Sequence, residues 1–444
     1  MFSKILVANR VEIAVRIIRA CKEMGIHTVA IYSEADKDAL HADLADEGYC
    51  IGGPLVKDSY LNIDAILSIA IHCGVEAIHP GYGLLSENAD FARKCIENDI
   101  VFIGPSPDVI DKMGDKDEAR RTMKNAGVPI IEGSDIVESV EEGMAIADKI
   151  GYPILIIARS GGGGRGIRPV YAREEFESNY ISAKEEAKAA FGDGALYIEK
   201  YLVNVKHVEV QVLADSEGKV VILGDRDCSA QRKNQKLIEE CPAPTLPNDI
   251  REKMYEAAIK ATKAVGYVTV GTIEFLLDSS NKFYFMEMNT RLQVEHSVTE
   301  MVCGIDIVQW QIRTAAGIPI SFDEKEVRMD GHAIECRICA EDPKNFMPSC
   351  GEIKILHVPG GPNVRFDSAI YQNYVVPPYY DSMLGKVIVY SKTREGAIRK
   401  MRSALSELVI YGITNNSDMH LELISDDKFE KGIYTTDFLK DRWL

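Results

Sequence analysis

Pro153-Ile-Leu-Ile-Ile-Ala-Arg-Ser-Gly-Gly-Gly-Gly-Arg-Gly-Ile-Arg-Pro-Val-Tyr171 is the stretch that decides the fold. Apolar residues over 153–158 predict a strand, 160–166 predicts a glycine-rich loop, and 167–171 predicts a second strand. Glycines let backbone N–H groups approach a polyphosphate closely, and Arg165 adds positive charge. The stretch therefore predicts a strand–loop–strand lid over nucleotide phosphates, with a merely flexible surface loop as the alternative.

The same glycines also match a dinucleotide motif, but their context excludes that interpretation. Gly161, Gly163 and Gly166 satisfy G-x-G-x-x-G. In a dinucleotide site this motif opens a helix, whereas Pro169 and a strand pattern follow here. The loop is therefore not predicted to bind a nicotinamide or flavin cofactor.

N-terminal to the lid, short apolar strands alternate with helical patterns. Residues 4–8 predict a strand, 12–24 an amphipathic helix and 27–32 a second strand. This alternation is typical of a doubly wound parallel sheet. The first turn, Asn9-Arg10-Val11, lacks the glycines of a dinucleotide site. C-terminal to the lid the pattern is rich in strands, with one clear helix over 394–408. We therefore expect a multidomain protein of mixed α/β and α+β class.

Length and charge narrow the function classes. The chain has 444 residues and a formal net charge of −17. An acidic protein is a poor candidate for non-specific binding to nucleic acid or to an anionic membrane. No apolar run approaches the roughly 20 residues that span a bilayer, and the N-terminus shows no signal-peptide pattern. We expect a cytoplasmic protein.

The ten cysteines are scattered, which fits a reducing compartment. Cys336 and Cys339 have the spacing of a metal or redox pair. They lie in a predicted strand, where positions three apart point to opposite faces. We expect ordinary buried thiols.

Polar side chains recur every second residue on two predicted strands and single out a candidate metal site. His207, Glu209 and Gln211 share one face of a strand, and Glu287 and Asn289 share a face of another. A third strand carries one isolated acid, Glu274. Oxygen ligands on neighbouring strands beside phosphates are how Mg²⁺ is held. Half-exposed strands and a buried ion pair remain the alternatives.

A basic segment indicates an anionic substrate. Residues 226–236 read Arg-Asp-Cys-Ser-Ala-Gln-Arg-Lys-Asn-Gln-Lys. A solvated basic face is the alternative. Further along, 291–296 combines Arg291 with Glu295, and a carboxylate beside an anion site could act as a general base.

Taken together, these segments resemble the biotin carboxylases, which are ATP-grasp enzymes, over essentially the whole chain. The matching stretches are Asn9-Arg10, 79–88, 113–116, the glycine loop, 199–201, 226–229, 287–296, 335–337 and 377–383. Because so many long motifs occur in the same order as in the family, chance agreement is negligible. The resemblance implies a biotin carboxylase N-terminal domain over 1–113, an ATP-grasp domain over 114–330 with its lid at about 131–202, and a biotin carboxylase C-terminal domain over 331–444.

The resemblance also implies a reaction: MgATP and bicarbonate give carboxyphosphate, and the carboxyl group passes to N1′ of biotin. For ATP it implies Lys116, Gly161, Gly162, Gly163, Gly164, Arg165, Gly166, Glu199, Lys200, Leu202, His207, Gln231 and Asn234. For Mg²⁺ or Mn²⁺ it implies Glu274, Glu287 and Asn289. For bicarbonate and biotin it implies Lys236, Arg291, Gln293, Val294, Glu295, Arg337, Tyr82 and Asp381. Glu295 would deprotonate bicarbonate, and Arg337 would stabilise the biotin enolate.

Several positions depart from the family pattern. Ile157 stands where the family has a lysine that touches the ATP phosphates, and Arg159, on the same strand face, stands where a small residue is usual. We hypothesise that Arg159 partly replaces the missing charge. Val11 replaces a glycine, and valine tolerates a positive φ poorly. Other departures are Ser297 and Cys350 in place of prolines, and Val268-Thr-Val270 in place of a glycine-containing run.

The biotin is expected on a separate carrier protein, because the usual biotinylation tetrapeptide, Ala/Val-Met-Lys-Met, occurs nowhere in the 444 residues. The resemblance then favours the biotin carboxylase subunit of an acetyl-CoA carboxylase in fatty acid biosynthesis, and next a pyruvate carboxylase. It implies carboxyltransferase partners and a homodimer. A catalytically impaired relative with a structural or regulatory role is an alternative, and another ATP-grasp ligase is a weaker one.

Overall fold

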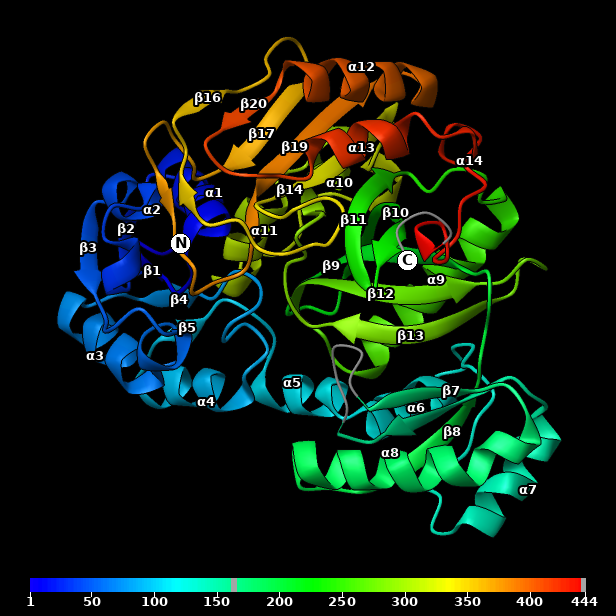
Figure 1. Ribbon diagram of the computed structural model, residues 1–444. Helices are drawn as coiled ribbons and strands as arrows, with labels where there is room; N and C mark the ends of the chain where they lie inside the picture. Colours follow the sequence, from blue (N-terminus) through cyan, green and yellow to red (C-terminus); the bar gives the residue numbers. More distant parts are fainter. Residues whose placement is uncertain (161–165, 441–444) are drawn as a thin grey trace.

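A parallel sheet forms the N-terminal part of the computed structural model, which describes residues 1–160 and 166–440 (Figure 1). Its strand order is β3-β2-β1-β4-β5. The strands are β1 (Lys4–Val7), β2 (His27–Tyr32), β3 (Glu47–Cys50), β4 (Ala77–His79) and β5 (Val101–Phe102). The helices are α1 (Val11–Glu23), α2 (Leu40–Leu44), α3 (Ile63–Cys73), α4 (Ala89–Glu97) and α5 (Pro107–Gly114).

Both faces of this sheet are covered, as a doubly wound fold requires. Ile5 and Val7 of β1 pack with Ile17 of α1. Leu6, which points to the opposite face, packs with Phe91 of α4. The predicted parallel sheet is confirmed, and the helix predicted over 12–24 is α1.

The lid is a separate three-stranded antiparallel sheet, which stands out from the body at the lower right of Figure 1. Its order is β7-β6-β8. The lid elements are α7 (Val140–Ile150), β6 (Ile154–Ala158), β7 (Ile167–Val170), α8 (Phe176–Phe191) and β8 (Leu196–Lys200). The preceding helix α6 (Lys116–Asn125) packs in the core of the body through Ala119 and Met123. The two strands predicted around the glycine run are β6 and β7. Residues 161–165 of the predicted loop, and with them Gly161, Gly162, Gly163, Gly164 and Arg165, lie outside the described residues.

An eight-stranded antiparallel sheet forms the centre of the molecule, in the order β13-β12-β9-β10-β11-β14-β19-β17. The strands are β9 (Lys206–Ala214), β10 (Val220–Arg232), β11 (Gln235–Cys241), β12 (Thr269–Leu277), β13 (Phe283–Asn289), β14 (His332–Cys339), β17 (Val364–Ser368) and β19 (Met383–Ser391). Because β11 pairs with β14, this sheet is continuous across position 330, where the sequence predicts a domain boundary.

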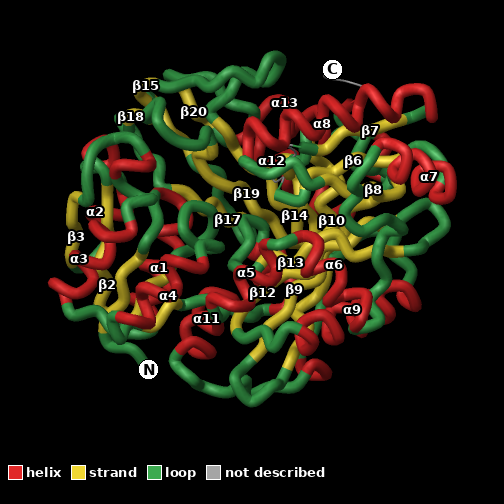
Figure 2. The backbone as a smooth tube through the Cα atoms, turned by 90° about the horizontal axis from the view of Figure 1, so that it is seen from below, coloured by secondary structure: helices red, strands yellow, loops and turns green. Residues whose placement is uncertain are grey.

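Helices and short ribbons complete the fold (Figure 2). The helices are α9 (Asn248–Ala264), α10 (His296–Cys303), α11 (Ile307–Ala315), α12 (Arg394–Glu407), α13 (Ser417–Ile424) and α14 (Asp427–Glu430). The ribbons pair β15 (Gly351–Glu352) with β18 (Val375–Val376) and β16 (Ile355–His357) with β20 (Val409–Tyr411). Within the described ranges, no helix is both long and apolar enough to cross a bilayer. Cys336 and Cys339 are buried, unpaired thiols, as predicted.

Two β-branched residues have a left-handed backbone where the sequence departs from a glycine-containing pattern. Val11, the first residue of α1, has φ 42°, and Thr269, the first residue of β12, has φ 90°. Glycine adopts such angles without steric cost, whereas a β-branched residue does not. Both positions are therefore strained.

Candidate functional site

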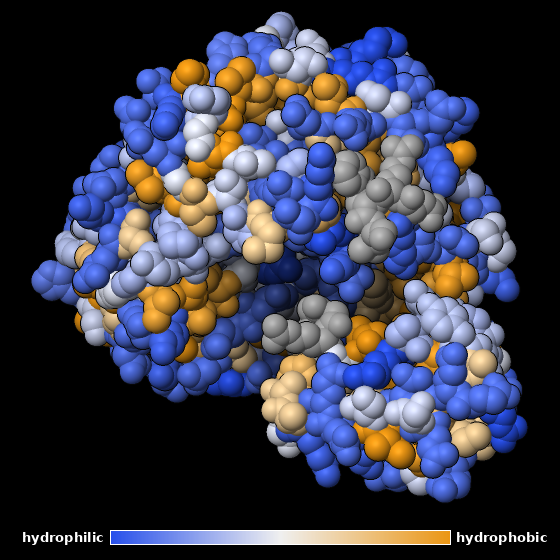
Figure 3. All heavy atoms as spheres, in the orientation of Figure 1, coloured by the Kyte–Doolittle hydropathy of each residue, from blue (hydrophilic) through white to orange (hydrophobic). Residues whose placement is uncertain are grey.

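A hollow lies between the lid and the body of the molecule. Figure 3 shows this hollow with mainly hydrophilic residues on its walls. The body supplies side chains from β9, β11, β12, β13 and β14, together with the segment 290–295 that leads into α10. Strands that neighbour one another in the sheet thus bring together residues distant in the sequence.

Lys236 of β11 is the centre of the site. Its Nζ lies 2.7 Å from Glu209 Oε2, 2.8 Å from Glu274 Oε1 and 2.7 Å from Glu295 Oε1. The three carboxylates are buried. One cation thus holds three acids from three different segments at one point.

Glu295 connects this centre to Arg337 of β14. Arg337 Nη2 donates to Glu295 Oε2 at 2.9 Å, and Arg337 Nε donates to Glu239 Oε1 at 2.6 Å. The two oxygens of Glu295 therefore face two different cations, Lys236 and Arg337. In this arrangement an anionic substrate can take the place of the Glu295 carboxylate at Lys236 or at Arg337.

The protonation states follow from these contacts. Burial alone would lower the pKa of Lys236, but Glu209, Glu274 and Glu295 outweigh it and raise this pKa well above its ordinary value. Burial alone would raise the pKa of Glu295, but Lys236, Arg337 and Arg226 hold it below the ordinary value. Glu295 is therefore an ionised carboxylate, and it gains basicity when substrate takes over its cations.

Glu274 of β12 joins the centre to the candidate metal ligands. Its Oε2 lies 2.8 Å from His207 Nε2, and its Oε1 accepts hydrogen bonds of 2.8 Å from both Asn289 Nδ2 and Gln293 Nε2. Glu287 lies directly opposite Glu274 in the β12–β13 ladder. Two carboxylates and an amide on paired strands form an oxygen-rich set of the kind that suits Mg²⁺ or Mn²⁺. The residues present therefore fit a divalent cation.

Arg291 connects the site to the N-terminal part of the chain. Its Nε donates to Glu87 Oε2 at 2.9 Å, and its Nη2 donates to Asn289 Oδ1 at 2.8 Å. Glu87 Oε1 also accepts from the backbone N–H of Thr290 at 3.1 Å. Glu87 thus fixes the start of the segment that carries Glu295.

The structure corrects the interpretation of the basic segment 226–236. Arg226 has no exposed surface. Its Nε donates to Glu209, and its Nη1 donates to Gln211 Oε1 at 2.7 Å and to Thr299 Oγ1 at 2.9 Å. The buried carboxylate of Glu209 neutralises the charge of Arg226 inside the protein. The expectation that Arg226 faces an anionic substrate is therefore wrong. Lys236, at the other end of the segment, does reach the site.

The lid contributes a different kind of surface. Ile154, Ile156 and Ala158 of β6 pack against α7 and α8, so Ile157 lies on the opposite face, where Glu199 of β8 also lies. Burial raises the pKa of Glu199, and the positive charge of Lys116, at the start of α6, opposes this rise. Lys200 Nζ is turned away and donates to Gly151 O at 2.8 Å.

Arg159 is engaged in a pair of its own. Its Nη2 lies 2.9 Å from Asp193 Oδ2, and its Nε donates to the same oxygen at 3.1 Å. Its side chain is 45% exposed. Gly166, at the described end of the glycine run, accepts a hydrogen bond of 2.8 Å from the Ala158 N–H. Arg159 is thus held by Asp193, and the hypothesis that it replaces a lysine at 157 requires it to leave this partner.

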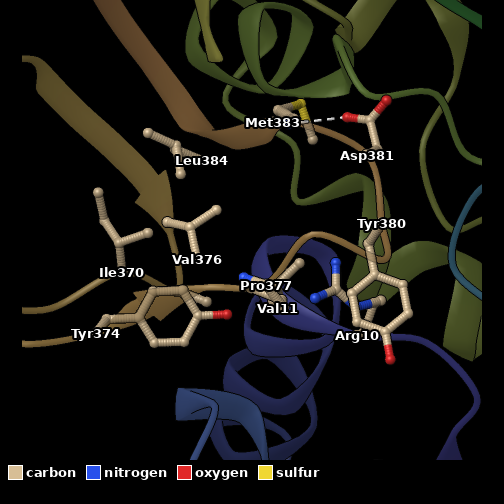
Figure 4. A pocket seen from close by; sticks show the side chains of 11 residues that line it. Arg10, Val11, Ile370, Tyr374, Val376, Pro377, Tyr380, Asp381, Met383 and Leu384 are labelled. Carbon is tan, nitrogen blue, oxygen red and sulfur yellow. Dashed lines mark hydrogen bonds between the residues drawn. The ribbon is translucent and has the colours of Figure 1, made fainter. Parts of the chain in front are cut away.

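The remaining predicted residues lie around the centre. The Tyr82 hydroxyl donates a hydrogen bond to Glu12. Burial raises the pKa of Tyr82 above its ordinary value, and the positive charge of Arg337 opposes this rise. Asp381 is exposed and accepts the Met383 N–H at 2.9 Å (Figure 4). Gln231 of β10 lies opposite Lys236 of β11, and Asn234 is at the tip of the hairpin that joins these strands. Leu202 is half-buried. The carbonyl of Val294 accepts a hydrogen bond of 2.6 Å from Lys386 Nζ.

Three acids hold the predicted cations: Glu209 binds Lys236, Glu239 binds Arg337, and Glu87 binds Arg291. The alternation on its strand singled out Glu209 beside a metal site, and the structure shows it as a partner of Lys236, whereas Glu87 and Glu239 were missed. Glu87 lies within the matching stretch 79–88, whereas Glu239 carries no comparable signal.

Comparison with protein families covers nearly the whole chain. Residues 1–110 match the model of the biotin carboxylase N-terminal domain. Residues 115–322 match that of the carbamoyl-phosphate synthase L chain ATP-binding domain. Residues 335–441 match that of the biotin carboxylase C-terminal domain.

Individual proteins agree with these models. Biotin carboxylase 1 of Bacillus subtilis is 56% identical over 443 residues, which cover 99% of this chain and 98% of that protein. The Campylobacter jejuni biotin carboxylase, solved as a β-γ-ATP complex, superposes with a TM-score of 0.97 at 49% identity and covers 100% of this chain and 99% of its own. The biotin carboxylase domain dimer of Hydrogenobacter thermophilus 2-oxoglutarate carboxylase, solved with MgADP, ADP and bicarbonate, superposes with a TM-score of 0.94 at 50% identity, covering 99% and 98%. These comparisons give no support to an impaired relative.

Proposed function

We propose that this chain, which belongs to the biotin carboxylase family, uses ATP and bicarbonate to carboxylate biotin. One observation carries the proposal above the others. Glu295 lies 2.7 Å from Lys236 Nζ and 2.9 Å from Arg337 Nη2, so a base and two cations meet at one point. Bicarbonate needs both a base to remove its proton and cations to hold its charge.

The residues divide the reaction between them. Lys236 and Arg291 bind bicarbonate, and Glu295 accepts its proton, which makes the oxygen a nucleophile toward the γ-phosphorus of ATP. ADP leaves and carboxyphosphate forms. Arg337 then stabilises the negative charge that develops on the biotin ureido oxygen. The bond between the carboxyl carbon and the phosphate oxygen of carboxyphosphate breaks, the leaving phosphate takes the proton from N1′, and N1′ takes the carboxyl group. Tyr82 and Asp381 line the biotin end of the site.

The nucleotide would lie between the lid and the body, with its metal ligands on the body strands β12 and β13. Lys116, Glu199, Lys200, Leu202, His207, Gln231, Asn234 and the glycine run bind ATP. Glu274, Glu287 and Asn289 would hold Mg²⁺ or Mn²⁺, which neutralises phosphate charge when bound. The domain limits 1–113, 114–330 and 331–444 are part of the same proposal, and one sheet runs through the last two by the pairing of β11 with β14.

The partners are proposed from the same likeness. A separate carrier protein presents the biotin, a carboxyltransferase uses the product, and the chain forms a homodimer. Acetyl-CoA carboxylase is the proposed system, with pyruvate carboxylase as the second candidate.

The test is bicarbonate-dependent ATP hydrolysis stimulated by biotin. We expect the wild type to release phosphate faster when free biotin or a biotinylated carrier is added, and to require bicarbonate. Glu295→Gln keeps the shape of the side chain but removes the base, so the rate should fall by about 10³-fold. A wild type whose ATP hydrolysis does not respond to biotin in either form would overturn the proposal.

A further inference from the structure

The backbone of Arg337 lies where its strand loses a neighbour. The ladder between β11 and β14 runs from Cys241↔Ala333 to Ile238↔Cys336, and Arg337 is the next residue along β14. Its partner on the other side, Lys386 of β19, continues the sheet. The carbonyl of Arg337 therefore depends on other groups for hydrogen bonds, because a buried carbonyl without a partner is costly.

Asn416, the residue just before α13, replaces the missing strand. Its side-chain Nδ2 donates to Arg337 O at 3.1 Å, and its Oδ1 accepts from the Cys339 N–H at 2.8 Å. Its own backbone N–H donates to Cys339 O at 3.2 Å. Asn416 is 1% exposed. One residue thus reproduces the bonds that a neighbouring strand would make to two successive positions on the same edge of β14.

His420, one turn further along α13, binds the same carbonyl. Its Nε2 lies 2.7 Å from Arg337 O, and its ring is fully buried. A carbonyl only accepts, so Nε2 carries the hydrogen and donates it. Burial lowers the pKa of His420 to about 4, so the ring is neutral at neutral pH. Asn416 and His420 therefore make two hydrogen bonds to one carbonyl oxygen.

We propose that Asn416 and His420 are positioning residues that fix the backbone of Arg337 and so aim its guanidinium at biotin, a role that rests on the proposed function. Neither side chain touches the substrate in this role. They act through the main chain, from the edge of β14 that faces α13.

The need for such a contact follows from the state of the guanidinium. In the absence of substrate Glu239 and Glu295 hold it. During the reaction Glu295 turns to bicarbonate and Arg337 turns to biotin, so part of that support is lost. The bonds to Asn416 and His420 lie at the other end of the residue and persist. They hold the Cα in place while the side chain exchanges partners.

Substitutions at 420 separate the hydrogen bond from the packing. His420→Leu removes the donor, whereas His420→Gln keeps an N–H of similar reach. Asn416→Asp keeps the oxygen that accepts from Cys339 but cannot donate to Arg337 O. Met419→Ala is the matched control, because Met419 is buried in the same helix and packs in the hydrophobic core.

The measurements are kcat and KM for biotin, and the bicarbonate-dependent ATP hydrolysis without biotin. We expect His420→Leu and Asn416→Asp to lower kcat for biotin carboxylation by about tenfold, the value of one hydrogen bond. We expect hydrolysis without biotin to stay at the wild-type rate, and His420→Gln to restore kcat. Met419→Ala should lower the melting temperature and leave kcat unchanged.

Two results would overturn the inference alone. One is a wild-type kcat in both His420→Leu and Asn416→Asp. The other is an equal loss of the biotin-dependent and biotin-independent rates, which would indicate a merely structural role. If His420→Leu does not fold, the kcat of Asn416→Asp is compared with the kcat of His420→Gln, and the comparison distinguishes the same outcomes. A wild type that does not respond to biotin would overturn the proposed function, and this inference with it.

Discussion

The two walls of the cleft satisfy their charges in different ways. On the body side, Lys236, Glu274, Glu295 and Arg337 form one buried network with contacts of 2.7 to 2.9 Å. On the lid side, Ile157 of β6 is apolar and buried on the face turned away from α7 and α8, and the nearby cation Arg159 is bound to Asp193. The chemistry is assembled before substrate arrives, whereas the described part of the lid offers the phosphates little fixed charge.

This difference predicts that a substitution in the body network costs more than one at Ile157. In the body network each cation holds several acids, so a change at one residue leaves a buried charge without its partner. A lid residue that faces the cleft has no such obligations in the absence of nucleotide. The departure at 157 falls on the lid side, whereas those at Val11, Thr269, Ser297 and Cys350 lie in the body, and none of them replaces Lys236, Glu295 or Arg337.

Removal of Lys236 should have the largest effect and would break the body network. Lys236→Met removes the one cation that Glu209, Glu274 and Glu295 share, and leaves Arg226 on Glu209 and Arg337 on Glu295. We expect biotin-dependent turnover to disappear and the free energy of unfolding at pH 7 to fall by about 3 kcal/mol or more. Denaturant unfolding measures the second effect. Lys253→Met is the control: Lys253 is 61% exposed on α9, so its loss should change stability by less than about 0.5 kcal/mol.

The pH dependence of this destabilisation gives a sharper test of the same network. The pKa values of Glu274 and Glu295 are lowered in the folded protein despite burial, chiefly by Lys236. A lowered pKa contributes stability above the ordinary value of 4.5, and this stability is lost as pH falls below it. Without Lys236 that contribution is missing. The gap between wild type and Lys236→Met should therefore be widest near pH 7 and narrower at pH 4; a gap of equal size at both would contradict the network.

A lysine at 157 tests the lid side. Ile157 lies on the cleft face of β6, and Arg159 is paired with Asp193. A lysine at 157 would therefore add a positive charge for the ATP phosphates, and Ile157→Lys should raise kcat/KM for ATP by about tenfold. The biotin KM should not change. Ile157→Met is the control, because it alters shape without adding charge.

The rival hypothesis, that Arg159 already supplies the charge, makes the opposite prediction. Ile157→Lys would then raise kcat/KM for ATP little, and Arg159→Ala would lower it strongly. Steady-state kinetics at varied ATP distinguishes the two. An unchanged kcat/KM in Ile157→Lys together with a large loss in Arg159→Ala would show that Arg159 leaves Asp193 to bind the phosphates.

Local patterns predicted the elements well and the long-range pairing poorly. The strands β6 and β7 and the helices α1 and α12 follow from residue periodicity, which acts within a few residues. The continuity of the sheet between β11 and β14 does not, because it joins strands about 100 residues apart. The domain boundary at 330, which the family resemblance implies, gives no sign that the sheet continues across it.

The same limit applies to the site. Residue type and alternation singled out Lys236, Glu274 and Glu295 as chemically active. Their partners were harder to predict: Glu239 lies 98 residues from Arg337, and Glu87 lies 204 residues from Arg291. Arg226 was misread because a basic segment in the sequence does not reveal which of its cations are already neutralised in the interior.

The smallest effect concerns strain outside both walls, at Val11. Val11 lies next to Pro377 and Arg10 in Figure 4 and, with them and Tyr380, lines a small cavity at the start of α1. Its φ of 42° costs a valine about 1 to 3 kcal/mol, and glycine loses about 0.5 to 1 kcal/mol in chain entropy. Val11→Gly should therefore stabilise the protein by about 1 kcal/mol and leave kcat unchanged. Arg19→Gly, at an exposed position within the same helix, should destabilise it by about 1 kcal/mol. The same residue introduced eight positions apart then acts with opposite sign, and unfolding midpoints that shift in the same direction would show that Val11 is not strained.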